Sequence, residues 1–328
     1  MGNTLDKKTV KLINLFILII VLVIFLFGYF NLSLSNKSIY KEINYFPGNH
    51  SWEKMWTEWD PAEINNELNF ANDLGIKSVD TQIPYYVFYN ESMQQINSTL
   101  MERAQQFVNI SHGKNMKVIF TLFDKVTNVS DETKWKYHED FLSKFISNFT
   151  NDNNIEAWGL HNEIDLLITT DKNPRSEVLN WTKEMTQTIR QIDKNHSIEI
   201  EVTDVDNVSE FAPYADRIGL SAYKYVLNSQ FTLDMAVKEL QTDANGKNVT
   251  ISEVGWASNG TSGEERQKNV YNYFLSVAKS NGISVRIWTL MDFSNIPNNL
   301  PESEKHFGLI TTNYTKKPAY FIFKNFPN

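Results

Sequence analysis

The sequence predicts an α/β domain, an eight-stranded parallel (β/α)8 TIM barrel, preceded by one N-terminal transmembrane helix. Two observations predict the barrel. Extended apolar segments alternate with helical segments from residue 41 to residue 328, which is typical of a parallel α/β fold. The length of this region is close to the ~250 residues of a typical barrel of this kind. A doubly wound sheet is the alternative, but no glycine-rich loop follows the first strand.

Strands are expected where short apolar runs end at polar or turn residues. Eight such runs occur, at residues 43–46, 78–83, 117–123, 155–160, 198–203, 217–222, 249–252 and 285–290.

Helices are expected between the strands, and several carry end signals. Asp60 precedes a proline and predicts an N-cap, and Gly75 predicts the end of that helix. Ser262 and Glu265 predict a capping box at a later helix, which Gly282 ends. Apolar stripes inside these helices indicate faces that pack on the barrel.

The N-terminus predicts a membrane anchor. Residues 15–30 are apolar apart from Gly28, and three lysines precede them, at positions 7, 8 and 11. This length approaches that of a membrane span, and the lysines place the N-terminus in the cytoplasm. A cleaved signal peptide is the alternative, although no small-residue cleavage site follows. We expect a tail (1–11), a transmembrane signal anchor (12–30), a linker (31–40) and the barrel (41–328).

The rest of the chain is expected to lie outside the cell as the external part of a single-pass membrane protein. It contains 14 Asn-x-Ser/Thr motifs, where random placement gives roughly five. This excess favours an exported glycoprotein, although an asparagine-rich chain also forms such motifs by chance.

Charge and composition exclude several classes. The chain has 31 basic and 39 acidic residues, a net charge of −8 and a pI near 5.4, so nucleic acid is not an expected partner. It has no cysteine, which excludes disulfides and cysteine-bound metal centres. The six histidines show no metal-binding spacing, and no P-loop or G-x-S-x-G motif is present. No cofactor and no metal are expected.

Two glutamates follow predicted strands. Glu163 comes after the fourth strand, preceded by Asn162, and Glu253 follows the seventh. In a parallel barrel these positions lie at the catalytic end. Each glutamate alone is explained by a helix cap or a lysine partner, but two at matched positions predict a functional pair. Two carboxyl groups across a cleft can cleave a glycosidic bond, one as acid and the other as nucleophile or base.

With these motifs, the sequence resembles the retaining glycoside hydrolases of clan A, and most closely family 5, the cellulase and mannanase group. The resemblance covers roughly residues 42–320 in register. It rests on Asn162-Glu163, on Glu253 and on the segment 287–293, with weaker matches elsewhere. The weaker matches are the segments 44–47, 121–124 and 306–309.

The resemblance implies a role for five residues. Glu163 would be the general acid/base and Glu253 the nucleophile. Asn162 would bind the 2-hydroxyl of the reacting sugar, and Tyr223 would donate a hydrogen bond to Glu253. Trp288 would form the platform on which that sugar stacks.

Four further residues are expected to contact substrate. Tyr45 and Asp124 lie in segments that match the family, and Trp256 follows the seventh strand as one of several aromatic residues expected at the barrel opening. His161 lies beside the catalytic motif and either lines the cleft or belongs to the core.

The sequence departs from the family at three positions. Asp80 stands where family 5 has an arginine that supports the nucleophile, Ser221 replaces a histidine, and Ile164 replaces a proline. If Asp80 faces Glu253, its like charge raises the pKa of Glu253.

The sequence therefore predicts a membrane-anchored extracellular glycoside hydrolase. It would cleave β-linked oligo- or polysaccharide by a retaining double displacement with two glutamates. The alternative is a glycan-binding surface protein on the same barrel, with weak or no catalysis.

Overall fold

The computed structural model describes residues 39–169, 172–260 and 262–327. Eight parallel strands close into a barrel, in which β1 pairs with both β2 and β10. The strands of the barrel are β1 (Lys41–Asn44), β2 (Ser78–Pro84), β5 (Lys117–Asp124), β6 (Ile155–Gly159), β7 (Ser197–Val202), β8 (Arg217–Ser221), β9 (Asn248–Glu253) and β10 (Ser284–Ile287). The predicted barrel and its eight strands are confirmed.

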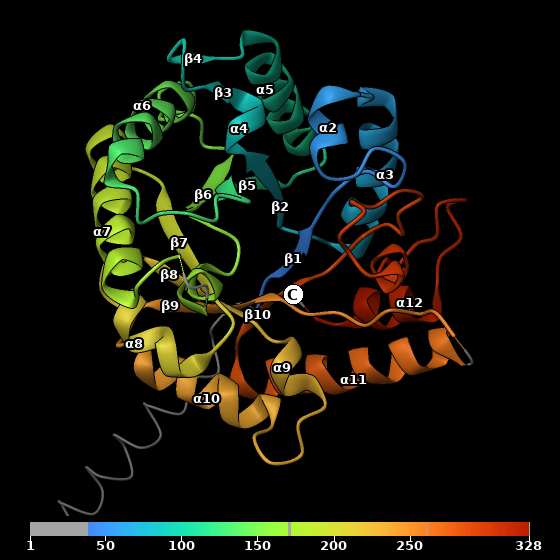
Figure 1. Cartoon of the computed structure of the whole chain (residues 1–328). Coiled ribbons are helices and arrows are strands. Elements are labelled where there is room, and N and C mark those ends of the chain that lie inside the picture. Colours follow the sequence, from blue (N-terminus) through green and yellow to red (C-terminus); the bar gives the residue numbers. More distant parts are fainter. Residues whose placement is uncertain (1–38, 170–171, 261, 328) are drawn as a thin grey trace, which may run out of the picture. The chain divides into compact units, whose positions relative to one another are not determined.

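Helices surround the barrel, as Figure 1 shows. The longer ones are α3 (Pro61–Leu74), α5 (Ser98–His112), α6 (Trp135–Ile146), α7 (Arg175–Ile192), α10 (Leu233–Asp243), α11 (Gly263–Asn281) and α12 (Pro318–Asn325). Four short helices, α2 (Glu53–Thr57), α4 (Tyr85–Phe88), α8 (Val208–Phe211) and α9 (Tyr223–Val226), lie in the connections. The connections also hold a small hairpin of β3 (Tyr89–Asn90) and β4 (Gln95–Ile96), which the sequence did not predict. Five short 3-10 helices complete the described part: η1 (Glu132–Lys134), η2 (Ile164–Thr169), η3 (Val205–Asn207), η4 (Ala212–Tyr214) and η5 (Glu302–His306).

The predicted ends of α3 are confirmed, whereas the prediction of a capping box at the start of α11 is wrong. Asp60 accepts hydrogen bonds from the first backbone amides of α3, and Gly75 ends the helix at φ 76°. Ser262 has φ 61° and its side chain caps no amide. This left-handed conformation lies outside the extended region that an N-cap side chain uses.

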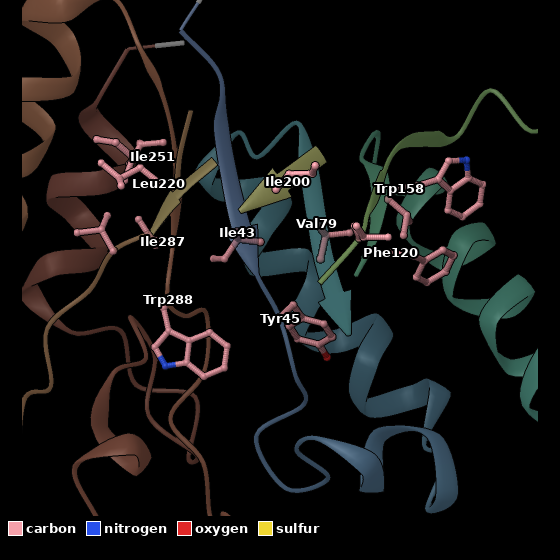
Figure 2. Close-up of a cluster of buried hydrophobic side chains, with 14 of the residues drawn as sticks. Ile43, Tyr45, Val79, Phe120, Trp158, Ile200, Leu220, Ile251, Ile287 and Trp288 are labelled. Carbon is pink, nitrogen blue, oxygen red and sulfur yellow. The ribbon is translucent and has the colours of Figure 1, made fainter. Parts of the chain in front are cut away.

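The apolar core lies between the strands and the helices. Phe120 of β5 packs against Phe145 of α6 at a ring distance of 5.5 Å, and Trp158 of β6 lies 6.3 Å from the same ring. Figure 2 shows Phe120 and Trp158 among the buried side chains of this layer. Side chains alternate along a strand, so the neighbouring residues face the inside of the barrel.

The inside of the barrel is built from charged and small residues. Arg286 of β10 lies 2.6 Å from Asp80 of β2 and 2.8 Å from Glu199 of β7. Arg217 of β8 pairs with Glu199 and with Glu42 of β1. Small neighbours make room for these side chains: Gly219, for example, lies so close to Ser252 that a Cβ there would come within 2.5 Å of it.

The predicted tail, the transmembrane segment (12–30) and most of the linker (31–40) lie outside the described residues. Among the residues that the structure describes, no helix has the length and apolar character of a membrane span.

Candidate active site

The two glutamates lie at the same end of the barrel. Glu253 is the last residue of β9, and Glu163 follows β6 in the turn before η2. The carboxyl ends of barrel strands are where enzymes of this fold place their catalytic groups.

Glu253 is surrounded by acidic groups. The hydroxyl of Tyr223 donates a hydrogen bond to its Oε1 at 3.0 Å, so the predicted contact is present. Burial raises the pKa of Glu253 well above its ordinary value, and the charges of Glu201, Glu163 and Glu304 raise it further. The tyrosine hydrogen bond acts in the opposite direction. In the described part of the chain, no lysine, arginine or histidine forms an ion pair with this carboxylate.

Glu163 has the properties of a proton donor. Ser221 donates a hydrogen bond to its Oε1 at 2.7 Å, so the serine that replaces the family histidine contacts the predicted acid/base. Burial raises the pKa of Glu163, the hydrogen bond from Ser221 lowers it, and the charge of Asp165 raises it. A raised pKa favours the protonated form of the carboxyl group, which is the form that a general acid requires.

The turn that carries Glu163 is held by His161. Its Nδ1 lies 2.6 Å from the carbonyl oxygen of Asn162, and its Nε2 lies 2.9 Å from that of Val126. Both ring nitrogens therefore face the backbone, and this histidine positions the turn instead of facing substrate. Glu163 itself has φ 52°, an uncommon conformation that such support maintains.

A small cavity adjoins Asn162 and Trp288. Its volume is about 10 Å³, enough for one water molecule. Gln82 also lines it, and the Oε1 of this side chain is buried without a hydrogen-bond partner among the described residues. Asn162, Gln82 and Trp288 thus line one common space, and Asn162 directly precedes Glu163 in the chain.

Trp288 is fixed by its neighbours. Its ring centroid lies 5.9 to 6.1 Å from those of Phe46, Trp52 and Phe293, in tilted or edge-on contacts. Its Nε1 donates to Glu304 Oε2 at 3.0 Å. Figure 2 shows Trp288 following Ile287. The predicted sugar platform therefore has a defined orientation.

Two residues that were expected to contact substrate, Tyr45 and Trp256, make contacts with other side chains of the protein. Tyr45 is buried, stacks on Phe107 and donates its hydroxyl to Glu67 at 2.8 Å, so this hydroxyl is not free for a sugar. One face of the Trp256 ring is covered by Arg266, whose guanidinium carbon lies 4.7 Å from the ring centroid.

Asp124 ends β5 and lies buried beside Lys125. Burial raises the pKa of Asp124 to about 6, while Lys125 lowers it.

The expected role of Asp80 is wrong. Asp80 lies 2.6 Å from Arg286 and accepts a hydrogen bond from Thr121 at 3.1 Å, and it is not among the principal charges that act on Glu253. The like charge that acts most strongly on Glu253 comes from Glu201 of β7. Burial and the charge of Glu163 raise the pKa of Glu201 to about 8.

Sequence reasoning missed two acidic residues of the site. Glu201 follows Glu199 with one residue between them, and this spacing in a strand places both on one face. It could therefore have been found. Glu304 lies in a long connection after β10, where no pattern indicates its position.

One group of side chains outside the catalytic pair offers several potential metal ligands. His50, Asp60 and Glu63 place three ligand atoms within 4.8 Å of one another. Asp60 accepts from backbone amides of α3, and Glu63 accepts from the amide of Asn49 at 2.9 Å. These contacts attach the loop after β1 to α3 and indicate a structural role.

A closed parallel barrel with a glutamate after β6 and another at the end of β9 has the architecture of a retaining glycosidase of clan A. The family model described as cellulase (glycosyl hydrolase family 5) matches residues 40–294. The chain therefore belongs to glycosyl hydrolase family 5, which confirms the resemblance seen in the sequence.

Solved structures show the same fold. An exo-β-1,4-mannosidase from Opitutaceae bacterium strain TAV5 superposes with a TM-score of 0.74 at 16% identity, over 88% of this chain and 59% of that one. A GH5_18 protein from Streptomyces cattleya in complex with GlcNAc gives 0.74 at 14% identity, over 88% and 79%. A GH5_18 protein from Bifidobacterium longum subsp. infantis gives 0.72 at 16% identity, over 88% and 78%. A comparison of the sequence with curated proteins found no match.

Proposed function

We propose that this protein cleaves β-linked glycans with Glu163 as acid/base and Glu253 as nucleophile. The observation that carries the proposal is the pair of glutamates at the catalytic end, each with its own hydroxyl donor. Ser221 contacts Glu163 and Tyr223 contacts Glu253. Both hydroxyl donors lower the pKa of the glutamate that they contact. The reaction requires Glu253 to be ionised and Glu163 to be protonated when substrate binds.

The reaction has two steps. Glu163 gives its proton to the glycosidic oxygen while the Glu253 carboxylate attacks the anomeric carbon, so a glycosyl ester forms and the alcohol leaves. Glu163, now ionised, removes a proton from water, which attacks the same carbon and releases Glu253. Two inversions at one carbon retain its configuration.

β-Mannosides are the first substrates to test. One structural neighbour is named as an exo-β-1,4-mannosidase, and a variant of the Streptomyces cattleya GH5_18 protein was crystallised with Manβ1-4GlcNAc. These titles describe proteins that share the fold at low identity, and they motivate the choice of this sugar class for the assay.

The test compares two variants of the full chain on 4-nitrophenyl β-mannoside and β-glucoside. Glu163→Ala should retain slow cleavage, because 4-nitrophenol leaves without protonation, and azide should raise its turnover by attacking the glycosyl ester. Glu253→Ala should lose activity on both substrates, because no ester forms.

The controls separate catalysis from binding. Equal losses in both variants, with no effect of azide, would refute the division of roles. Glycan binding by a folded wild type without turnover would instead support a glycan-binding protein.

We further propose that the barrel is extracellular and anchored by the N-terminal segment. The apolar run at 15–30, the lysines before it and the 14 glycosylation motifs support this. Protease added to intact cells should remove the barrel. Cleavage in lysed cells only would contradict the orientation.

A further inference from the structure

Glu304 lies within the electrostatic reach of the catalytic pair, although it is distant in sequence from both glutamates. Its Oε2 accepts the indole hydrogen of Trp288 at 3.0 Å. The charge of Glu304 also raises the pKa of Glu253 and of Tyr223. The pKa of Glu304 itself is raised mainly by burial and also by the charge of Glu163. Glu304 is therefore a further carboxyl group of the site, in contact with Trp288, the predicted sugar platform.

The segment that carries Glu304 is held in place on both sides. The amide of Phe293 donates a hydrogen bond to the carbonyl oxygen of Lys305 at 3.1 Å. The amide of Ser258 donates one to the carbonyl oxygen of His306 at 2.9 Å. The ring of Phe307 packs edge-on against Tyr223 at 6.0 Å. These contacts connect the segment to the loops after β9 and β10, so the position of Glu304 is defined by the barrel.

The second carboxylate oxygen of Glu304 is available to a ligand. Within the residues that the structure describes, Oε1 accepts no hydrogen bond, and no basic side chain forms an ion pair with Glu304. The neighbouring cation Lys305 lies 2.9 Å from Glu302 instead. A carboxylate held by one indole N–H retains an acceptor for a sugar hydroxyl.

The charges near this oxygen are of one sign. The charges of Glu163, Glu304 and Glu201 raise the pKa of Glu253, and the charge of Glu163 raises the pKa of Glu304. Asp292, on the same loop as Phe293, is paired with Lys317 at 2.6 Å. A ligand that carries its own carboxylate would meet repulsion here without a cation to bind it.

We propose that Glu304 binds a hydroxyl of the sugar that stacks on Trp288, and that it makes the site selective for uncharged sugars over glycuronides. This inference rests on the proposed function, because it concerns the sugar whose bond is cleaved. Glu304 is thus a specificity-determining residue at the edge of the platform, whereas the catalytic pair lies at the anomeric carbon.

The test uses the full chain and three aryl substrates. They are 4-nitrophenyl β-mannoside, β-glucoside and β-glucuronide, and the last differs from the glucoside only in a carboxylate at carbon 6. Glu304→Gln keeps an acceptor for the Trp288 indole and removes the charge. Glu302→Gln is the matched control, because Glu302 lies on the same 3-10 helix with its side chain 72% exposed and paired with Lys305.

We expect the wild type to cleave an uncharged glycoside at least 100-fold more efficiently than the glucuronide. Glu304→Gln should lower kcat/KM for the uncharged glycoside by about 10- to 100-fold, the loss of one hydrogen bond to a charged group. It should also reduce the preference over the glucuronide at least tenfold. Glu302→Gln should change neither quantity by more than about twofold.

The outcomes distinguish the two proposals. A folded wild type that cleaves none of the three substrates would overturn the proposed function and this inference together. A wild type that is active while both glutamine variants match it would overturn the role of Glu304 alone. Efficient cleavage of the glucuronide by the wild type would overturn the selectivity. Glu304→Asp, which keeps the charge on a shorter side chain, should retain the selectivity and raise KM.

Discussion

Replacing Tyr223 by phenylalanine removes the side-chain hydrogen bond that, among the described residues, favours the ionised form of Glu253. The tyrosine hydroxyl donates to Glu253 at 3.0 Å, and this bond lowers a pKa that burial and three carboxyl groups raise. Glu253 must be ionised to attack, so its pKa appears as the acid limb of the pH profile of kcat/KM. Without the hydroxyl this limb moves to higher pH.

The size of the shift follows from the contact. A hydrogen bond to a charged group contributes about 1.5–3 kcal/mol. One pKa unit corresponds to about 1.4 kcal/mol, so the acid limb should rise by about one to two units in Tyr223→Phe. Below the wild-type limb, kcat/KM should therefore fall about 10- to 100-fold, with a smaller loss at high pH. The assay is kcat/KM for one aryl glycoside across the pH range.

A matched control is available in the same chain. Tyr271 is fully buried and its hydroxyl has no partner among the described residues, so Tyr271→Phe removes an unpaired hydroxyl. This variant should leave the limb unchanged and should not reduce stability. An unmoved limb in a folded, active Tyr223→Phe protein would mean that this hydroxyl does not stabilise the nucleophile.

The remaining predictions concern Glu201, Asp80 and Arg286, three charged residues inside the barrel. Glu201→Gln should move the acid limb to lower pH, because it removes the charge that most strongly raises the pKa of Glu253; a limb that stays in place or rises would refute this. Asp80→Asn should leave the acid limb unchanged, because Asp80 is paired with Arg286 at 2.6 Å. A clear shift of the limb would mean that the charge of Asp80 does act on Glu253. Arg286→Met should lower the free energy of unfolding in urea by about 3–5 kcal/mol, because it leaves Asp80 buried without its cation and leaves Glu199 with Arg217 alone. A loss below about 1 kcal/mol would contradict the network.

Much of the fold could be predicted because the signals are local. Apolar runs mark the eight strands, and Asp60 with Gly75 marks the ends of α3. The capping box at Ser262 failed because its backbone conformation is left-handed, and the residue pattern alone does not determine φ. The β3–β4 hairpin has two residues in each strand, too few for a periodic pattern.

The site was predictable where residues follow a strand directly, and less so elsewhere. The positions of Glu163 and Glu253 follow from barrel topology. Asp80 also ends up inside the barrel, but its partner Arg286 is 206 residues away, and one sequence does not specify that pairing. Glu304 depends on a loop whose path is fixed by backbone contacts with Phe293 and Ser258, which leave no mark in the sequence.

The separation of an ionic interior from an apolar outer layer has a consequence for how this barrel tolerates mutation. Along β10, Val285 and Ile287 face the apolar layer, where substitutions that conserve volume cost little. Arg286 between them shares its charge with carboxylates from three other strands. A saturation library of this strand should therefore accept many apolar residues at the two outer positions and almost none at the central one. Loss of Arg286 would leave Asp80 without its cation, whereas Glu199 and Glu42 would keep Arg217. Asp80 is therefore the position expected to vary together with Arg286.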